Sequence, residues 1–215
     1  MTYRFALPRT ASSARSGSPL ILTVPGLDGS GPGHWQTLWE ARDSRVRRVE
    51  MGDWSKPNRN IWVNRLNLAI HRAARPVILV AHSLGCLTVA WWAHYERPAY
   101  GDPVIGALLV APPDVDGPLM EPRLQGFAPT PIGPLPFPST LIASRDDPWS
   151  RFEHSARLAR FWGSHFVDAG EAGHLNADSG LGGWDEGRRA LTRLARQALS
   201  GPQRPPEPSD LSLFA

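Results

Sequence analysis

Short runs of apolar residues alternate with longer amphipathic stretches along most of this chain, and glycine and proline residues bound the runs. A continuous apolar run is typical of a strand buried on both faces, as in a parallel sheet that helices cover. The alternation therefore predicts successive βαβ units and the α/β fold class.

The apolar runs predict six strands, and the amphipathic stretches between them predict helices. The expected strands are Leu20–Val24, Val46–Val49, Val77–Ala81, Ile105–Val110, Thr140–Ser144 and His165–Val167. The expected helices are Trp35–Ala41, Ile61–Arg72, Leu84–Tyr95, Phe152–Phe161 and Glu186–Leu199. We expect one doubly wound domain, with a mostly parallel central sheet of about six strands and helices on both faces.

A length of 215 residues suits a single domain with a well-formed core. We expect residues 19–199 to form the α/β domain, residues 1–18 a weakly ordered leader, and residues 200–215 a proline-rich tail. Residues 112–138 are crowded with prolines, which predicts a long loop that overhangs a site. Nothing in this stretch indicates a helical lid domain.

Composition excludes several classes of protein. The net charge is only +3 and the basic residues are scattered, so we expect no nucleic-acid partner. No segment approaches the roughly 20 apolar residues of a membrane span, and no secretory signal pattern is present. The lone Cys86 permits no intrachain disulfide. We expect a cytoplasmic protein with no membrane partner, and the oligomeric state is not indicated.

Chemically useful side chains follow three of the predicted strands. Ser83 follows the strand at 77–81, Asp146 and Asp147 follow the strand at 140–144, and His174 follows the strand at 165–167. Ligands bind beyond the carboxyl ends of the strands in an open parallel sheet. The chain order serine, aspartate, histidine is that of the α/β-hydrolase triad.

This set of residue types suits nucleophilic catalysis. A serine hydroxyl needs a base within hydrogen-bond reach, histidine titrates near working pH, and a carboxylate orients the imidazole. The nucleophile turn requires small neighbours, here Ala81 and Gly85. The usual pattern is Gly-x-Ser-x-Gly, so Ala81 is a departure from it.

Two backbone amides are candidates for an oxyanion hole, which needs preorganised N–H donors. One is the amide of Leu84, directly after Ser83, and the other is that of Leu27, in the glycine-rich loop after the first strand. Gly26 lets that loop come close to a reacting carbonyl.

Four segments together resemble the small α/β-hydrolases of the retinoblastoma-binding protein nine and YdeN type. They are Val-Pro-Gly-Leu-Asp-Gly-Ser with His34-Trp35, Ala-His-Ser-Leu-Gly, Ile-Ala-Ser-Arg-Asp-Asp-Pro, and Gly-His-Leu-Asn-Ala-Asp-Ser-Gly-Leu-Gly. The resemblance covers roughly residues 19–199 and implies a minimal sheet that lacks the first two strands of larger members. It also implies a triad of Ser83, Asp147 and His174. Asp146 competes for the acid role, and the family's placement of the acid before proline favours Asp147.

Each of these residues also has an ordinary structural interpretation. Ser83 alone is more often a helix cap, Asp147 a turn residue, and His174 a packed loop histidine. Their joint occurrence at strand ends favours a site. The glycine-rich loop lacks the spacing of a nucleotide fingerprint, and the histidines lack ligand spacing, so we expect neither a cofactor nor a metal. We expect Cys86 to be a small packed side chain.

The sequence therefore predicts a carboxylesterase-like serine hydrolase that cleaves an ester or related acyl bond through an acyl-enzyme. Its substrate would be a small acyl compound, with Trp35, Trp149 and Trp184 as candidate walls of an acyl pocket. The alternative is a non-catalytic protein-binding module that has retained the fold.

Overall fold

The computed structural model describes residues 17–117 and 121–200. The predicted leader and proline-rich tail fall almost entirely on residues 1–16 and 201–215, which lie outside the described residues. The domain boundaries drawn at residues 18 and 199 therefore remain predictions.

Six parallel strands form one sheet in the order β2-β1-β3-β4-β5-β6. Each predicted strand is present, and no end differs from the prediction by more than one residue. The strands are β1 (Leu20–Val24), β2 (Val46–Arg48), β3 (Val77–His82), β4 (Val104–Val110), β5 (Ser139–Ala143) and β6 (His165–Asp168). The order reverses between β1 and β3, so the chain winds outward from the centre in both directions, as a doubly wound fold does.

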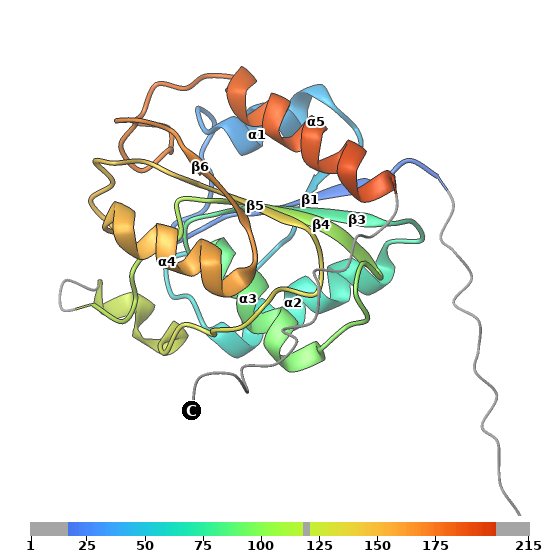
Figure 1. Cartoon of the computed structure of the whole chain (residues 1–215), viewed down its shortest axis with the longest axis horizontal. Coiled ribbons are helices and arrows are strands. Elements are labelled where there is room, and N and C mark those ends of the chain that lie inside the picture. The colour runs from blue at the N-terminus through green and yellow to red at the C-terminus, as the bar shows by residue number, and fades with distance from the viewer. Residues whose placement is uncertain (1–16, 118–120, 201–215) are drawn as a thin grey trace, which may run out of the picture.

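Helices cover both faces of the sheet, which confirms the predicted α/β architecture. In Figure 1, α1 and α5 lie on one face, and α2, α3 and α4 lie on the other. The helices are α1 (Trp35–Arg42), α2 (Arg59–Arg72), α3 (Leu84–Glu96), α4 (Phe152–Trp162) and α5 (Asp185–Leu199). Across residues 17–117 and 121–200, no helix has both the length and the apolar character that crossing a bilayer demands.

The sheet separates two apolar clusters, and β3 contributes to both. Leu79 packs on the α2, α3 and α4 side, whereas Ile78 and Val80 pack on the α1 and α5 side. Successive side chains point to opposite faces and helices cover both faces, so residues 77–81 are all apolar and the whole strand is buried. This explains why the continuous runs were a reliable strand signal.

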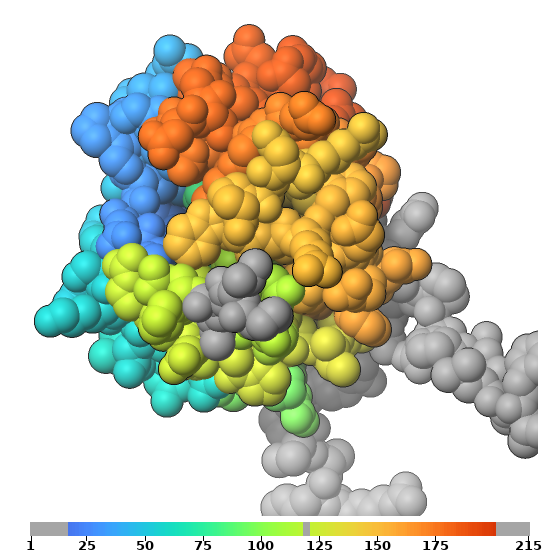
Figure 2. Space-filling model, turned by 90° about the vertical axis from the view of Figure 1, so that its left-hand side faces the viewer, coloured from blue at the N-terminus to red at the C-terminus, as the bar shows by residue number. Residues whose placement is uncertain are grey.

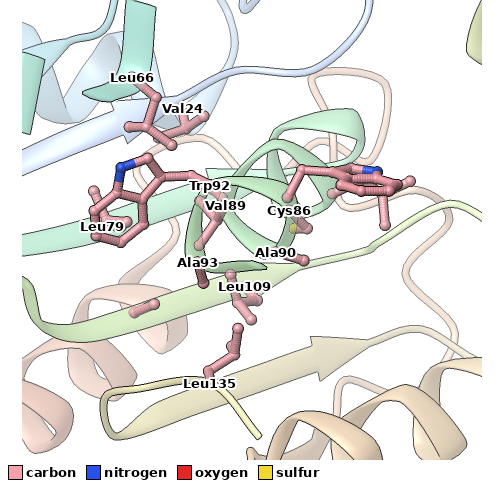
Figure 3. Packing of buried hydrophobic residues seen from close by; sticks show 14 of the residues in the cluster. Val24, Leu66, Leu79, Cys86, Val89, Ala90, Trp92, Ala93, Leu109 and Leu135 are labelled. Atoms are coloured by element: carbon pink, nitrogen blue, oxygen red, sulfur yellow. The ribbon is translucent and has the colours of Figure 1, made fainter. Parts of the chain in front are cut away.

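Helix α3 is buried over most of its length, and Figure 3 shows its side chains packed among residues of the sheet and of α2. Cys86 lies in this cluster with no exposed surface, as predicted, and its Sγ contacts the carbonyl of Val110 at 3.4 Å. Burial raises the pKa of the Cys86 thiol, so the group stays protonated and unreactive.

The proline-rich stretch contains a short 3₁₀ helix, η1 (Pro122–Phe127), which the sequence analysis did not predict. Proline at its first turn has no N–H to lose from the helix, and six residues are too few to show a helical period. Leu124 and Phe127 enter the core from η1. The segment is therefore a packed cover over part of the domain, and not a helical lid domain.

The turn from β3 into α3 passes very close to β1. A Cβ added to Gly85 would overlap the backbone carbonyl oxygen of Val24 and would lie 2.8 Å from that of Pro25. Neither atom can move without disturbing the β1 ladder. Gly85 therefore has to be a glycine for steric reasons.

We predict that Gly85→Ala lowers the free energy of unfolding by about 3 kcal/mol, because the backbone of β1 must shift to accept a methyl group. Gly126→Ala is the matched control, since a Cβ there meets nothing within 4 Å. That variant should change the unfolding free energy by no more than about 0.5 kcal/mol. Urea unfolding measures both, and equal stabilities for the two variants would contradict the steric argument.

Helix α1 begins after His34, whose Nδ1 accepts a hydrogen bond from the Gln36 backbone amide at 3.2 Å. His34 is 3% exposed. Its burial, and secondarily the positive charge of Arg48, lowers its pKa from 6.5 to about 4. An Nδ1 that accepts a hydrogen bond places the proton of the neutral ring on Nε2, and this nitrogen has no partner within the described residues.

The lowered pKa predicts that stability falls as the pH drops from about 6.5 to about 4. In this window the unfolded chain binds a proton at His34 while the folded protein does not, which favours unfolding by up to about 3 kcal/mol. His34→Asn keeps a capping acceptor but removes the titrating group. Urea unfolding across this pH range should show a shallower decline for the variant, and identical declines would contradict the prediction.

Candidate active site

The ends of three strands bring Ser83, His174 and Asp147 together. Ser83 follows β3 directly, Asp147 lies in the turn after β5, and His174 lies in the loop between β6 and α5. His174 Nε2 is 2.9 Å from Ser83 Oγ, and His174 Nδ1 is 2.9 Å from each carboxylate oxygen of Asp147. A carboxylate only accepts, so Nδ1 carries a proton and Nε2 is free to accept the hydrogen of the serine hydroxyl.

These side chains are largely removed from solvent. Ser83 is 7% exposed, and the side chain of Asp147 is 3% exposed. Besides His174, the Asp147 carboxylate accepts the backbone N–H of Trp149 at 2.9 Å. A buried carboxylate with these donors is fixed in position and directs the imidazole toward Ser83.

Asp146 contacts different groups, so the geometry separates the two aspartates that the sequence left in competition. Its Oδ1 accepts the Ser144 hydroxyl at 2.6 Å and the Gly173 backbone N–H at 2.8 Å. These hydrogen bonds, that of Ser144 first, lower the pKa of the Asp146 carboxyl. Asp147 is the carboxylate on His174, and Asp146 supports the backbone beside it.

Ser83 has a strained backbone, with φ 52° and ψ −126°. A non-glycine residue in such a conformation costs about 1–3 kcal/mol and persists only where its surroundings impose it. The serine side chain makes no capping hydrogen bond to α3. The helix-cap interpretation of Ser83 is therefore wrong, because the hydroxyl faces His174 instead.

The loop that carries Leu27 packs closely against the turn that carries Leu84. A Cβ on Gly26 would be 2.7 Å from Ser83 Cβ and 3.2 Å from the nitrogen of Leu84. Among the described residues, neither amide donates a hydrogen bond, whereas the next amide, that of Asp28, donates to the Trp54 carbonyl at 2.9 Å. Two unused donors therefore come from loops that meet at Ser83.

The three tryptophans proposed as pocket walls have different environments. Trp149 is 36% exposed, and its ring centroid is 5.6 Å from that of His174. Trp35 and Trp184 are only 1% and 5% exposed and belong to the apolar cluster beneath α1 and α5. Trp35 offers no surface that an acyl group could contact, so the structure does not support it as a pocket wall. Trp184 borders a cavity of about 430 Å³ together with Leu175 and Ala190, and its role as a pocket wall stays a prediction.

Arg123 and His82 make contacts near the site that were not predicted from the sequence. Arg123 Nη1 binds the Asp28 carboxylate at 3.0 Å, which links η1 to the glycine-rich loop beside Leu27. His82, 5% exposed, has its Nε2 2.9 Å from the carbonyl oxygen of His174. A histidine that ends an apolar run was the available signal for His82, but nothing near Arg123 in the sequence indicates Asp28.

Figure 2 shows the carboxyl-end face of the sheet, with a hollow bordered by the glycine-rich loop in blue, the His174 loop in orange and the turn after β5 in yellow. Residues 121–127, in yellow-green, lie below it. The parts of the chain that the structure describes contain no cluster of three or more histidine, cysteine or acidic side chains suited to a metal ion.

Comparisons with known proteins identify the family and the fold of the chain. A sequence model of the family described as serine hydrolase matches residues 21–193. A YdeN-like hydrolase from Pectobacterium atrosepticum is 30% identical, with a TM-score of 0.75 over 84% of this chain and 92% of the other. No curated protein gives a significant match.

Two more distant structures share the fold. The ydeN gene product of B. subtilis is 22% identical, with a TM-score of 0.65 over 82% of this chain and 98% of the other. Est1E from Butyrivibrio proteoclasticus is 12% identical, with a TM-score of 0.61 over 85% of this chain and 87% of the other. The family model covers most of the chain, and a YdeN-like hydrolase is 30% identical to it, so the chain belongs to the serine hydrolase family as a small hydrolase of the YdeN type.

Proposed function

We propose that the protein is a carboxylesterase-like serine hydrolase in which Ser83 is the nucleophile, His174 the general base and Asp147 the orienting acid. The observation that carries this proposal is the continuous chain of 2.9 Å contacts from Ser83 Oγ through the imidazole to Asp147. Each group has the chemical character that its role needs.

In the first half of the reaction, His174 Nε2 takes the proton of the Ser83 hydroxyl while Oγ attacks the carbonyl carbon of the ester. The carbonyl oxygen becomes an oxyanion. The imidazolium then gives its proton to the leaving alcohol oxygen, and the carbon–oxygen bond of the substrate breaks. The acyl group remains as an ester on Ser83.

In the second half, His174 takes a proton from water as the hydroxide attacks the acyl-enzyme. The second tetrahedral species collapses, the carboxylic acid leaves, and the imidazolium returns the proton to Ser83 Oγ. Asp147 stays ionised throughout, fixes the tautomer and stabilises the imidazolium that forms twice.

The amides of Leu27 and Leu84 are the proposed oxyanion hole. Support comes from their unused N–H groups within the described residues and from the close packing of Gly26 on the nucleophile turn. Preorganised donors of this kind stabilise charge that develops only in the transition state.

The proposed substrate is a small-molecule ester or related acyl compound. Trp149 offers a partly exposed ring beside His174 on which an apolar acyl or alkyl group can pack. No helical lid domain covers the hollow in the described residues. We also propose a cytoplasmic location, in keeping with a single cysteine that is buried and unpaired.

A fluorophosphonate probe tests whether Ser83 is a reactive nucleophile. We predict covalent labelling of the wild-type protein and none of Ser83→Ala, because the probe reacts only with a serine activated by its base. Ser55→Ala is the control and should label normally, since the Ser55 hydroxyl, the group that the substitution removes, bonds to the Asp53 carboxylate and not to the triad. A folded wild-type protein that does not label would favour the alternative of a non-catalytic binding module.

Steady-state hydrolysis of p-nitrophenyl esters tests the roles of the two aspartates. Ser83→Ala or His174→Ala should lower kcat by about 10⁶, since the groups act as a unit. Asp147→Asn should lower kcat by about 10⁴.

Asp146→Asn is the matched comparison and should cost far less, about tenfold, since Asp146 binds the Ser144 hydroxyl and the Gly173 backbone amide and does not bind the His174 ring. A larger loss for Asp146→Asn than for Asp147→Asn would overturn the assignment of the acid.

A further inference from the structure

The backbone on both sides of His174 is left-handed. Gly173 has φ 56° and Leu175 has φ 51°. Glycine accepts this conformation without strain, but leucine does not. The loop therefore needs external contacts to keep Leu175, and with it the direction of the His174 side chain, in place.

Contacts before His174 come from the turn after β5. Asp146 accepts the N–H of Gly173 at 2.8 Å, and Ser144 Oγ accepts the N–H of Ala172 at 2.8 Å. These bonds position the peptide groups that lead into the histidine. They leave the peptide groups after it to be positioned by other elements.

Two buried ring N–H groups bind the carbonyls of His174 and Leu175 themselves. His82 Nε2 is 2.9 Å from the carbonyl oxygen of His174, and Trp35 Nε1 donates to that of Leu175 at 2.8 Å. A carbonyl oxygen only accepts, so His82 carries its proton on Nε2. Desolvation by burial lowers the pKa of His82, which keeps the ring neutral.

The two donors come from the elements that carry the rest of the site. His82 is the last residue of β3 and is bonded covalently to Ser83. Trp35 is the first residue of α1, directly after the glycine-rich loop that contains Leu27. The histidine loop is thus hydrogen-bonded to the segment of the nucleophile and to the segment of one proposed oxyanion donor.

We propose that Trp35 and His82 are positioning residues, which hold two consecutive carbonyls so that the His174 ring stays within hydrogen-bond distance of Ser83. This inference rests on the proposed function. The His82 ring also lies beside the His174 ring, with 5.0 Å between the centroids, but neither Trp35 nor His82 makes a hydrogen bond to the triad side chains. Their effect passes through the backbone of His174 and Leu175, and a displacement near 1 Å at such a site can cost about 10²-fold in rate.

Trp39 supplies an internal comparison. It lies one turn further along α1, it is fully buried, and its Nε1 donates to the Gly183 carbonyl at 2.7 Å. The bond has the same chemistry and joins the same helix to the same loop, but it reaches a residue well beyond His174. Trp35 and Trp39 therefore differ mainly in which carbonyl they hold.

The test compares Trp35→Phe with Trp39→Phe, each of which removes one buried indole N–H and keeps an aromatic ring. Both variants should lower the melting temperature by similar amounts. Trp35→Phe should lower kcat for p-nitrophenyl acetate about 10- to 100-fold with KM within about twofold of wild type. Trp39→Phe should keep kcat within about twofold of wild type, and equal kcat values for the two variants would overturn the proposal.

A second pair of variants tests His82. His82→Leu removes the donor, whereas His82→Gln places an amide N–H near the position of Nε2. We expect His82→Leu to lose kcat as Trp35→Phe does, and His82→Gln to recover most of it. A role in packing alone would not distinguish the two, so failure of the glutamine to recover activity in a folded protein would count against the proposal.

A readout without turnover separates this proposal from the proposed function. The downfield proton resonance of His174 Nδ1–H reports its hydrogen bond to Asp147 in the resting protein. Trp35→Phe and His82→Leu should shift or broaden this resonance, and Trp39→Phe should leave it unchanged. Wild type without esterase activity would reject the proposed function. Resonances that are identical in all variants would reject the positioning role.

Discussion

Ser83 stands at φ 52° between β3 and α3, a conformation that a serine adopts only where the surrounding chain imposes it. This conformation directs Oγ away from the helix that follows and toward His174. Leu84 is the first residue of α3, so its amide has no intrahelical partner. Gly85 and Gly26 make the turn possible, because β1 and its following loop pass within van der Waals contact of it. Both the nucleophile and a proposed oxyanion donor therefore depend on the close packing of the β3–α3 turn against the end of β1.

The parallel sheet converts this local turn into a site. All six strands are parallel, so the loops that follow β1, β3, β5 and β6 lie at the same edge of the sheet. His174 comes from the long segment that precedes α5, where the backbone has little regular structure of its own. Its position is set by a hydrogen bond that the Gly173 amide donates to Asp146 and by hydrogen bonds that His82 and Trp35 donate to the next two carbonyls.

The sequence predicted the strands well because continuous apolar runs report burial on two faces, which only a covered parallel sheet provides. It also predicted the residues that meet at the site, because strand ends in such a sheet share an edge. Separating Asp146 from Asp147 needed coordinates, since both follow the same strand and only one carboxylate reaches His174. The 3₁₀ helix η1 was missed because six residues are too few to show a helical period.

Trp35 shows where sequence reasoning fails in physical terms. It lies beside a motif in the chain, and this proximity suggested a pocket. Proximity does not say to which side of the backbone a ring points, and the Trp35 ring points into the core. The hydrogen bond from Trp35 to Leu175 joins residues 140 positions apart, a separation that no periodicity reveals.

A crystal structure of the protein after reaction with a phosphonate ester tests the central claim most directly. We predict that phosphorus is bonded to Ser83 Oγ and that a phosphonyl oxygen lies about 3 Å from the amide nitrogens of both Leu27 and Leu84. We also expect His174 to remain hydrogen-bonded to Asp147. An adduct on another residue, or a phosphonyl oxygen that points away from both amides, would contradict it.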